Sequence, residues 1–515
     1  MEKLMKNILT NQKMQSVWKV IKWIFLILTN LLICLFVFAG LGFKEACVWV
    51  PEKFGNIPFE QILFTINTSV NGAGEGVMSE VWEACLKQPL LCAMSLLVFL
   101  FCFNTLFIYF KKNLLRRISL FLIFILSFAV FWDGFNDFSK QIGFYEYLNA
   151  YMHPSTLYED YYVDPASLEY MFPEKKRNLI YIYLESMETS YADQEHGGAL
   201  EESLIPELTK LATNKNTFTS GKGYTVLPSN GWTAASLVAS TSGANLKTPI
   251  AQDDTDVEYQ FMPGAYTLGQ ILEKEGYNQA LLIGSDGSFG QRDLYFSQHG
   301  NYQIEDYYYA KEIEWIPENY RVWWGYEDKK LFDFAKEELL RLSKESEPFN
   351  FTMLTADTHF FDGALCPDCE HTYPDQYSNV IRCSSKRIGK FIQWVKKQDF
   401  YENTTIVIAG DHLTMDDEWA LEHFGTDYQR KAYYTIINSP AEKQKDEDRE
   451  LTAFDFYPTI LTSLGVQYNG DRVGLGTNLY GTTPTLAEQL GSDELENQLK
   501  QFSIYYQEKI LKSSK

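Results

Sequence analysis

The apolar residues of the chain follow two patterns that change near residue 140. Before that point they form long runs at Ile21–Phe43, Pro89–Phe110 and Ile118–Trp132, and the last run can extend toward Phe138. The first two runs are long enough to cross a hydrocarbon layer of about 30 Å as helices. A cleaved signal peptide would account for the first run only, and that run is too long for a usual signal-peptide core. Residues 1–138 are therefore predicted to form a membrane domain with about three transmembrane helices.

Basic residues set the expected orientation of these helices. They precede the first run and lie between the second and third, whereas the loop after the first run is rich in glutamate. The basic positions are Lys3, Lys6, Lys13, Lys19, Lys22, Lys111, Lys112, Arg116 and Arg117. Because loops rich in lysine and arginine stay on the cytoplasmic side, we expect a cytoplasmic N-terminus and, after three spans, an extracytoplasmic remainder.

Beyond the membrane domain the pattern becomes one of short strands and helices. Residues 139–172 are aromatic and acidic and are interpreted as a juxtamembrane connector near the membrane surface. The expected strands are Asn178–Leu184, Ala280–Ile283, Phe349–Leu354 and Thr405–Ala409, and the helical patterns between them include Thr267–Glu275, Lys330–Lys344 and Ser384–Lys397. This alternation predicts an α/β domain over residues 173–515, with a mostly parallel sheet flanked by helices. The segment after about Gly481 is expected to be helical and peripheral.

Polar side chains follow each of these four strands. Glu185 follows the first strand, and Asp411 and His412 follow the last. Arg292 comes shortly after the second strand, and His359 after the third. Because ligands of open parallel sheets bind beyond the carboxyl ends of the strands, we expect these residues to converge on one edge of the sheet.

The composition limits what such a site can bind. The chain of 515 residues has a formal net charge of −22, with 46% hydrophobic and 16% aromatic residues. The negative charge argues against general nucleic-acid binding, which depends on lysine and arginine, and the hydrophobic content argues against global disorder. An anionic substrate would have to be held by a few well-placed cations or by a metal.

The acidic strand ends have structural explanations as well as chemical ones. Asp411 and His412 together offer the mixed oxygen and nitrogen ligands of a divalent metal. The same pair also suits a surface turn in which the aspartate caps a helix. Glu185 is either a metal ligand or half of a salt bridge, because a buried carboxylate is rarely left without a partner.

The two cationic candidates also have both a structural and a chemical interpretation. His359 is either a histidine of the core or a group that donates to a phosphate or a leaving oxygen. Arg292 either pairs with Asp293 or binds an anionic phosphate through its planar guanidinium. The aromatic residues of ENYRVWWGYEDKK, residues 318–330, are interpreted as core or rim.

Thr233, in the stretch PSNGWTAASLVAS, is a candidate nucleophile as well as a helix N-cap. It lies between a turn sequence and a run of helix formers, where its hydroxyl can accept a hydrogen bond from an orphan N–H group. A helix N-terminus also favours a phosphoryl group or an alkoxide, but an alcohol needs a base or a metal to become a nucleophile. The chain has no GxSxG motif, which argues against a hydrolase triad.

Three cysteines lie in the exported region. Cys366 and Cys369 form a CxxC pair, and Cys383 follows. A single CxxC is a weak zinc signal, so a disulfide from one of the pair to Cys383 is expected outside the cell. The spacing leaves open which pair forms.

Seven segments carry a resemblance to a known family: NLIYIYLESMETSY, NGWTAASLVAS, SDGSFGQRDLY, TADTHF, AGDHL, FDFYPTIL and GLGTNL. In these segments the chain resembles the membrane-anchored phosphoglycerol transferases of the alkaline phosphatase and sulfatase superfamily. Lipoteichoic acid synthases are similar in the same places, and NGWTAAS is most similar to the glucan-modifying phosphoglycerol transferases. The resemblance extends over residues of about 150 to 480.

The resemblance implies a mechanism and a location. One divalent metal, most often manganese, with magnesium and zinc as alternatives, would be held by Glu185, Thr233, Asp411 and His412. Thr233 would attack phosphatidylglycerol, release diacylglycerol and carry the glycerophosphoryl group to an envelope glycan or glycolipid. His359 would assist at the phosphate or leaving group and Arg292 would bind the donor head group. The protein would be a multi-pass component of the bacterial cell membrane with an extracytoplasmic catalytic domain.

Departures from related patterns define the alternatives. Lipoteichoic acid synthases have a tryptophan two residues before the matching arginine, where this chain has Gly290, so head-group contacts are expected to differ. Plain sulfatases need a C/S-x-P-x-R motif, which the chain lacks. Phosphoethanolamine transferases share the metal set but have a GTxTA-like stretch that NGWTAAS matches poorly. A catalytically inactive relative that binds the envelope is the third alternative, and neither the acceptor nor single transfer versus polymerisation follows from the sequence.

Overall fold

The computed structural model describes residues 2–55, 57–67, 77–214, 217–219, 223–247, 260–442, 444 and 448–512. The chain divides into two compact units. The first contains Met1–Ile57 and Glu75–Tyr145, and the second contains Pro58–Gly74 and Glu146–Lys515.

The first unit is helical throughout its described residues. Its α-helices are α1 (Glu2–Phe54), α3 (Val77–Val81), α4 (Lys87–Tyr109) and α5 (Asn113–Gln141), and a π-helical turn, Trp82–Leu86, joins α3 to α4. Three stretches are long and apolar enough to cross a membrane, namely Ser16–Phe54, Ser79–Tyr109 and Asn113–Gln141. The prediction of three apolar N-terminal helices is therefore confirmed, and the third is longer than its apolar run suggested.

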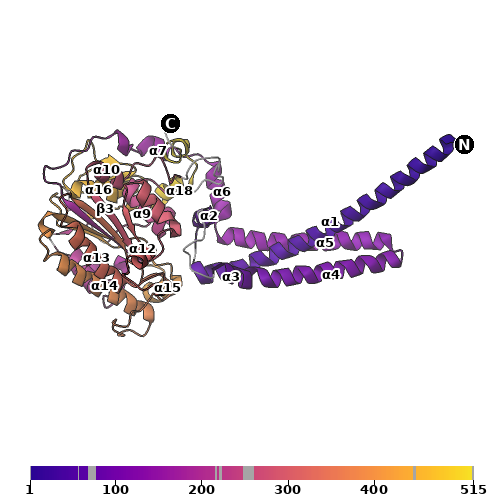
Figure 1. Cartoon of the computed structure of the whole chain (residues 1–515), viewed down its shortest axis with the longest axis horizontal. Helices are drawn as coiled ribbons and strands as arrows, with labels where there is room; N and C mark the ends of the chain where they lie inside the picture. The colour runs from indigo at the N-terminus through magenta and orange to yellow at the C-terminus, as the bar shows by residue number, and fades with distance from the viewer. Residues whose placement is uncertain are drawn as a thin grey trace. The chain divides into compact units, whose positions relative to one another are not determined.

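Glycines let α1 and α5 pack closely within this unit, where the long helices lie side by side (Figure 1). A Cβ atom on Gly134 would lie 2.1 Å from the carbonyl oxygen of Gly40, and one on Gly40 would lie 2.5 Å from the carbonyl oxygen of Val130. Small residues at such crossings are typical of helix packing in membranes, where close backbone approach replaces the hydrophobic driving force.

A seven-stranded sheet forms the centre of the second unit. Its strands are β1 (Asn178–Leu184), β2 (Thr217–Phe218), β3 (Asn278–Ile283), β4 (Gln303–Glu305), β5 (Phe349–Leu354), β6 (Thr404–Gly410) and β7 (Tyr434–Ile437). The order is β2-β7-β6-β1-β5-β3-β4. The strands from β6 to β4 are parallel, and β7 and β2 add antiparallel partners at one edge. The predicted mostly parallel sheet is confirmed, and its four predicted strands are β1, β3, β5 and β6.

Helices cover both faces of this sheet, and β1 shows how the core is divided. Leu179, Tyr181 and Tyr183 face one core layer, and the intervening Ile180 and Ile182 face the other. The first layer is closed by α9 (Thr233–Ser242), α10 (Leu268–Lys274) and α16 (Phe456–Ser463), and the second by α8 (Pro206–Ala212), α12 (Tyr307–Glu312), α13 (Asp328–Leu342) and α14 (Gln376–Val395). Figure 1 shows α10 and α16 on the opposite side of the strands from α13 and α14. The continuous burial of β1 is the pattern of a strand covered on both faces.

The remaining elements of the second unit are short. They are α2 (Phe59–Asn67), α6 (Phe144–Met152), α7 (Leu157–Tyr161), α11 (Arg292–Gln298), α15 (Asp417–Phe424), α17 (Leu486–Leu490), α18 (Ser492–Lys500) and the hairpin of β8 (Arg472–Val473) and β9 (Gly476–Thr477). The expectation of a peripheral C-terminal segment is wrong. Leu495 and Leu499 of α18 are completely buried in the first core layer, because their spacing puts both on one face of an otherwise polar helix.

Candidate active site

The parallel strands β6, β1, β5 and β3 are neighbours, so their carboxyl ends share one edge of the sheet. Glu185 follows β1 directly, and Asp411 and His412 follow β6. His359 lies in the turn after β5, and Arg292 begins α11 after β3. The fold thus brings the strand-end candidates to a single edge.

Three of these side chains form a buried cluster. Glu185, Asp411 and His412 are 3%, 0% and 2% exposed, and each offers a ligand atom within 4.8 Å of the others. The Nε2 atom of His412 lies 3.3 Å from Oε1 of Glu185 and 3.4 Å from Oδ2 of Asp411. Two carboxylates and an imidazole therefore meet at one point beneath the surface.

Thr233 adds a hydroxyl to this point. Its Oγ1 atom lies 3.4 Å from Oε2 of Glu185 and 3.4 Å from Nε2 of His412. The expectation that Thr233 is the N-cap of its helix is wrong. The N-cap is Trp232, whose backbone is still extended, and Thr233 is the first residue of α9. Its side chain is directed at the cluster, with no capping hydrogen bond from either residue.

Neighbouring groups orient the cluster. The hydroxyl of Ser186 donates to Oε1 of Glu185 at 2.8 Å, and its backbone N–H donates to Oδ1 of Asp411 at 2.9 Å. Ser186 has a φ of 52°, which is a disfavoured backbone region for serine. The hydroxyl of Thr358 donates to the carbonyl of Glu185 at 2.6 Å. The sequence reasoning missed Ser186, because only the bend after β1 brings it between two strand ends.

The donor set fits a divalent cation. The Nδ1 atom of His412 lies 2.8 Å from the carbonyl oxygen of Leu413, so Nδ1 carries a proton and Nε2 is the nitrogen that faces the cluster. The Oδ2 atom of Asp411 is buried and has no hydrogen-bond partner among the described residues. Carboxylate oxygens, an imidazole nitrogen and a hydroxyl that face one another are a ligand set of mixed oxygen and nitrogen type.

The three ionisable groups of the cluster shift one another's pKa values. Burial lowers the pKa of His412, but attraction to Asp411 and Glu185 outweighs it and raises the pKa to about 10. Burial and the charge of Glu185 raise the pKa of Asp411 to about 7. Burial raises the pKa of Glu185, yet attraction to His412 and His359 leaves it lowered, at about 2. A proton on His412 thus balances the carboxylates, and a cation would displace it.

Arg292 lies beside the start of α9 and is 7% exposed. Its Nη2 donates to the hydroxyl of Ser285 at 3.1 Å and to the carbonyl of Asp286 at 2.8 Å, and its Nε donates to the carbonyl of Phe289 at 2.8 Å. Among the described residues no hydrogen bond reaches its Nη1, and no ion pair joins it to Asp293. The loop before it packs on α9, since a Cβ on Gly290 would lie 3.4 Å from the Cβ of Ala234.

His359 belongs to an aromatic group that the sequence did not reveal. Its Nδ1 lies 2.7 Å from the carbonyl oxygen of Phe360, and its ring centroid is 4.9 Å from that of Trp324. Trp324 in turn stacks on Phe289, with centroids 5.7 Å apart. Burial lowers the pKa of His359 although Glu185 attracts its charged form. The imidazole is therefore neutral at neutral pH and can exchange a proton with a substrate oxygen.

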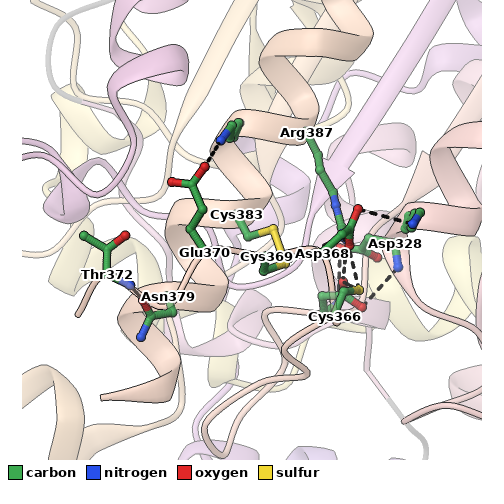
Figure 2. The surroundings of a disulfide bond; sticks show 12 residues. Asp328, Cys366, Asp368, Cys369, Glu370, Thr372, Asn379, Cys383 and Arg387 are labelled. Atoms are coloured by element: carbon green, nitrogen blue, oxygen red, sulfur yellow. Dashed lines mark hydrogen bonds and ion pairs between the residues drawn. A yellow bond between two sulfur atoms is a disulfide. The ribbon is translucent and has the colours of Figure 1, made fainter. Parts of the chain in front are cut away.

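A second buried group, which includes Asp328, Cys366 and Arg387, lies next to the disulfide (Figure 2). The disulfide joins Cys369 to Cys383, which resolves the pairing that the sequence left open, and Cys366 remains a free thiol. Arg387 donates to Oδ2 of Asp357 at 3.1 Å, and the thiol of Cys366 donates to the same oxygen at 3.3 Å. Burial and Asp357 raise the pKa of Cys366 to about 12, so the group is an un-ionised thiol.

Comparison with known proteins identifies the second unit. The sequence pattern of the sulfatase family matches residues 177–466, more than half of the chain. The chain belongs to the sulfatase family. The sulfatase family is part of the alkaline phosphatase superfamily. The matched region contains all the strand-end residues discussed above.

Two curated relatives are both phosphoglycerol transferase I. The protein from Salmonella choleraesuis (strain SC-B67) is 30% identical over 328 residues, which are 62% of this chain and 40% of that relative. The protein from Xanthomonas axonopodis pv. citri (strain 306) is 32% identical over 297 residues, which are 54% of this chain and 41% of that relative. The sulfatase-family chain thus matches about two fifths of the length of these relatives.

A solved structure shares the fold. The integral membrane protein lipooligosaccharide phosphoethanolamine transferase A from Neisseria meningitidis has a TM-score of 0.50 and 14% identity, and the match covers 83% of each chain. At this identity the likeness concerns the fold of the sulfatase-family protein alone.

Proposed function

We propose that this protein is a metal-dependent transferase that moves phosphoglycerol from phosphatidylglycerol to a cell-envelope glycan or glycolipid. The observation that carries the proposal is the meeting of the Thr233 hydroxyl with Glu185, Asp411 and His412. Relatives called phosphoglycerol transferase I, at about 30% identity, support the choice of phosphoglycerol as the transferred group.

Glu185, Thr233, Asp411 and His412 would hold one divalent metal, for which manganese is the first choice and magnesium and zinc are alternatives. Such a metal supplies Lewis-acid chemistry, since it stabilises negative charge on phosphoryl oxygens and favours ionisation of an alcohol. The protein orients its own ligands through Ser186 and through the carbonyl of Leu413. These two hydrogen bonds fix the orientation of the carboxylate and of the imidazole.

Thr233 is the proposed nucleophile. Its oxygen would bond to the phosphorus of phosphatidylglycerol while the bond from phosphorus to the diacylglycerol oxygen breaks. The hydroxyl proton of Thr233 would pass to solvent, and His359 would take up a proton from solvent at Nε2 and give it to the leaving oxygen, so that diacylglycerol departs as the free alcohol. An acceptor hydroxyl would then attack the glycerophosphoryl-threonine and restore the Thr233 hydroxyl. The N-terminus of α9 would add partial positive charge near the phosphoryl group.

Arg292 is the proposed contact for the donor head group. Its Nε and Nη2 are used in hydrogen bonds to its own loop, which holds the guanidinium plane in place. A planar guanidinium fixed in this way is suited to a phosphate or to head-group hydroxyls. Because Gly290 stands where lipoteichoic acid synthases have tryptophan, the head group would meet different side chains here.

The domain plan and the topology form part of the proposal. Residues 1–138 would span the membrane of a bacterial cell three times. Residues 139–172 would connect this membrane domain to the extracytoplasmic catalytic domain, which residues 173–515 would form. The short helix α2, in the loop between the first two spans, belongs to the second compact unit, and its Phe64 ring lies 6.3 Å from that of Phe261. That contact supports the proposal that the first loop and the catalytic domain lie on the same side, as three spans would give.

A phosphoethanolamine transferase is the second candidate function. The fold shared with lipooligosaccharide phosphoethanolamine transferase A, including membrane helices, favours it. An inactive envelope-binding relative is the third, and the intact cluster of Glu185, Asp411 and His412 argues against it.

A lipid-release assay tests these candidates. The purified full-length protein is mixed with vesicles that contain labelled phosphatidylglycerol or labelled phosphatidylethanolamine, with manganese, magnesium, zinc or chelator. We expect metal-dependent diacylglycerol release from phosphatidylglycerol only, lost in Thr233→Ala and retained in Thr213→Ala, a threonine at the C-terminal end of α8. Release from phosphatidylethanolamine alone would favour the second candidate, and release from neither lipid would contradict both enzyme proposals.

A further inference from the structure

Three apolar side chains are exposed at the outer end of the aromatic group that contains His359. Val322, Trp323 and Phe361 are 38%, 41% and 37% exposed. They come from two separate segments, the turn before α13 and the turn after β5. We name these three residues the apolar rim.

A series of ring and backbone contacts connects the apolar rim to the proposed nucleophile. The loop of Gly290 packs on Ala234, the neighbour of Thr233. From that loop, Phe289 stacks on Trp324, the neighbour of Trp323, and Trp324 contacts His359. On the other side, the His359 ring stacks on Phe360 at 4.7 Å, and the Phe360 ring contacts that of Phe361 at 4.9 Å. Both segments of the rim therefore flank the same catalytic histidine.

The backbone holds one rim segment in a fixed and costly conformation. Val322 and Gly325 exchange two backbone hydrogen bonds of 2.8 and 3.0 Å, which close a tight turn with Trp323 and Trp324 at its tip. Ser285 pairs with Gly325 at the end of β3, and a Cβ on Gly325 would lie 2.0 Å from the carbonyl oxygen of Gly284. Trp323 has a φ of 57°, a region that bulky residues rarely adopt unless their surroundings enforce it. The turn thus sends Trp324 inward and Trp323 outward.

Apolar side chains that gather at the surface next to a site are candidates for contact with a ligand. The donor in the proposed reaction has an anionic phosphodiester and an apolar diacylglycerol part. When the phosphorus lies at Thr233 and the leaving oxygen near His359, the first groups beyond that oxygen are the glyceryl esters and the acyl chains. A chain of net charge −22 gains little from electrostatic attraction to an anionic lipid surface, so apolar contact has to supply binding.

We propose that the apolar rim of Val322, Trp323 and Phe361 binds the acyl-glycerol part of the lipid donor and guides diacylglycerol away after transfer. This inference rests on the proposed function. It assigns a binding surface to the part of the lipid that the catalytic groups do not contact. The rim makes the enzyme selective for long-chain lipids over soluble esters of the same head group. Tryptophan and phenylalanine suit this role, since both are large and the indole also tolerates an interfacial position.

The test compares two donors in the full-length protein. The first donor is long-chain phosphatidylglycerol in vesicles, and the second is a water-soluble p-nitrophenyl ester of glycerol phosphate. For the double variant Trp323→Ser, Phe361→Ser we expect kcat/KM to fall about 30-fold on the vesicle lipid, and to change less than about twofold on the soluble ester. The matched control Leu340→Ser, Leu421→Ser removes two exposed leucines, 41% and 57% exposed, from α13 and α15. We expect the control to behave as wild type on both donors.

The outcomes separate the two proposals. An equal loss on both donors, or no loss on the vesicle lipid in a wild type that uses it, would overturn the rim while the proposed function stands. A wild type that turns over the soluble ester but not vesicle phosphatidylglycerol would overturn the proposed donor, and the rim with it. Because all the substituted side chains are exposed, circular dichroism of the variants is expected to match wild type.

Discussion

The sulfatase-family domain contains two groups of buried carboxylates with opposite hydrogen-bond patterns. In the strand-end cluster of Glu185, Asp411 and His412, ligand atoms face one another, and one carboxylate oxygen of Asp411 has no hydrogen-bond partner among the described residues. In the second group, Asp328 and Asp357 lie behind the His359 turn, and all four of their carboxylate oxygens accept hydrogen bonds. The two groups differ in how the charge is balanced, not in burial.

The bonds of the second group are those of a structural clamp. Asp328 accepts from the backbone N–H groups of Ala356 at 2.8 Å and Asp357 at 3.2 Å, and Asp357 accepts from the N–H of Asp328 at 3.1 Å. Arg387 balances the charge of Asp357 at 3.1 Å. Such a group already has its partners within the protein, so it holds the turn of His359 in place and needs no added ion.

The two groups together show how a candidate metal site is distinguished from a structural group of carboxylates. Burial and an excess of carboxylates are common to both groups, and both contain carboxyls with a raised pKa. Of the two groups, only the first has a buried carboxylate oxygen without a hydrogen-bond donor among the described residues. A metal is inferred where the protein leaves ligand atoms facing each other, and a clamp is inferred where backbone N–H groups already satisfy them.

The largest effect is expected for the nucleophile. Thr233→Ala should reduce phosphatidylglycerol turnover by about 10³-fold or more, because it removes the hydroxyl that lies between Glu185 and His412, and the nearby Ser186 hydroxyl is already bonded to Glu185. Thr233→Ser should retain part of the activity, because it keeps the oxygen. Initial rates of diacylglycerol release check both. Turnover of Thr233→Ala within tenfold of wild type would mean that the cluster acts without this residue.

Substitutions in the two carboxylate groups should change the free energy of unfolding in different directions. Asp357→Asn should destabilise the protein by about 3 kcal/mol with or without metal, because it leaves Arg387 with a weakened buried partner. Asp411→Asn should leave the metal-free protein as stable as wild type or more so, because its Oδ1 contacts survive and repulsion from Glu185 disappears. Chemical denaturation after chelation measures both. If both variants lose equal stability, the distinction between the groups is wrong.

Loss of the disulfide should destabilise the protein somewhat less than Asp357→Asn does. The loop between Cys369 and Cys383 spans 14 residues, and closing a loop of this size is worth about 2–3 kcal/mol. The double variant Cys369→Ser, Cys383→Ser should lose that amount, whereas Cys366→Ser should keep the disulfide. Denaturation curves together with peptide mapping under non-reducing conditions check this. A disulfide that involves Cys366 in the wild type would contradict the pairing.

The smallest expected effect is a pH dependence of metal binding. In the metal-free cluster the folded-state pKa of His412 is raised to about 10 from an ordinary value of 6.5, so its attraction to the carboxylates stabilises the protein fully below pH 6.5 and is lost as the pH rises toward 10. Metal must displace that proton. The apparent affinity should therefore rise about tenfold per pH unit between pH 7 and 9. Calorimetric titrations with manganese measure this slope, and a flat profile would contradict displacement of a proton from His412.

The central strands of the fold were predictable because each is buried on both faces and bounded by polar residues. β1 and β5 have their predicted bounds, and β3 and β6 begin at most two residues earlier. The short strands β2, β4 and β7 were not predicted. They have two, three and four residues, too few to establish a periodicity. Each is a strand because a neighbour offers it hydrogen-bond partners: β6 for β7, β7 for β2 and β3 for β4.

The strand-end residues could be named from sequence because parallel strands deliver their carboxyl ends to a common edge. The supporting groups could not, because they depend on contacts between distant segments. Trp324 reaches His359 through a turn anchored on β3, and Asp328 at the start of α13 reaches the turn after β5. The cap assigned to Thr233 was wrong by one residue, since a helix can begin one position earlier without any change in the sequence pattern.

The central claim is that Thr233 becomes covalently modified within the cluster of Glu185, Asp411 and His412. The most direct measurement is peptide-mapping mass spectrometry of the full-length protein after incubation with phosphatidylglycerol and manganese in the absence of an acceptor. We expect a glycerophosphoryl group on Thr233, absent when metal is chelated and absent in Asp411→Asn. Diacylglycerol release without modification of Thr233, or modification of a different residue, would contradict the account.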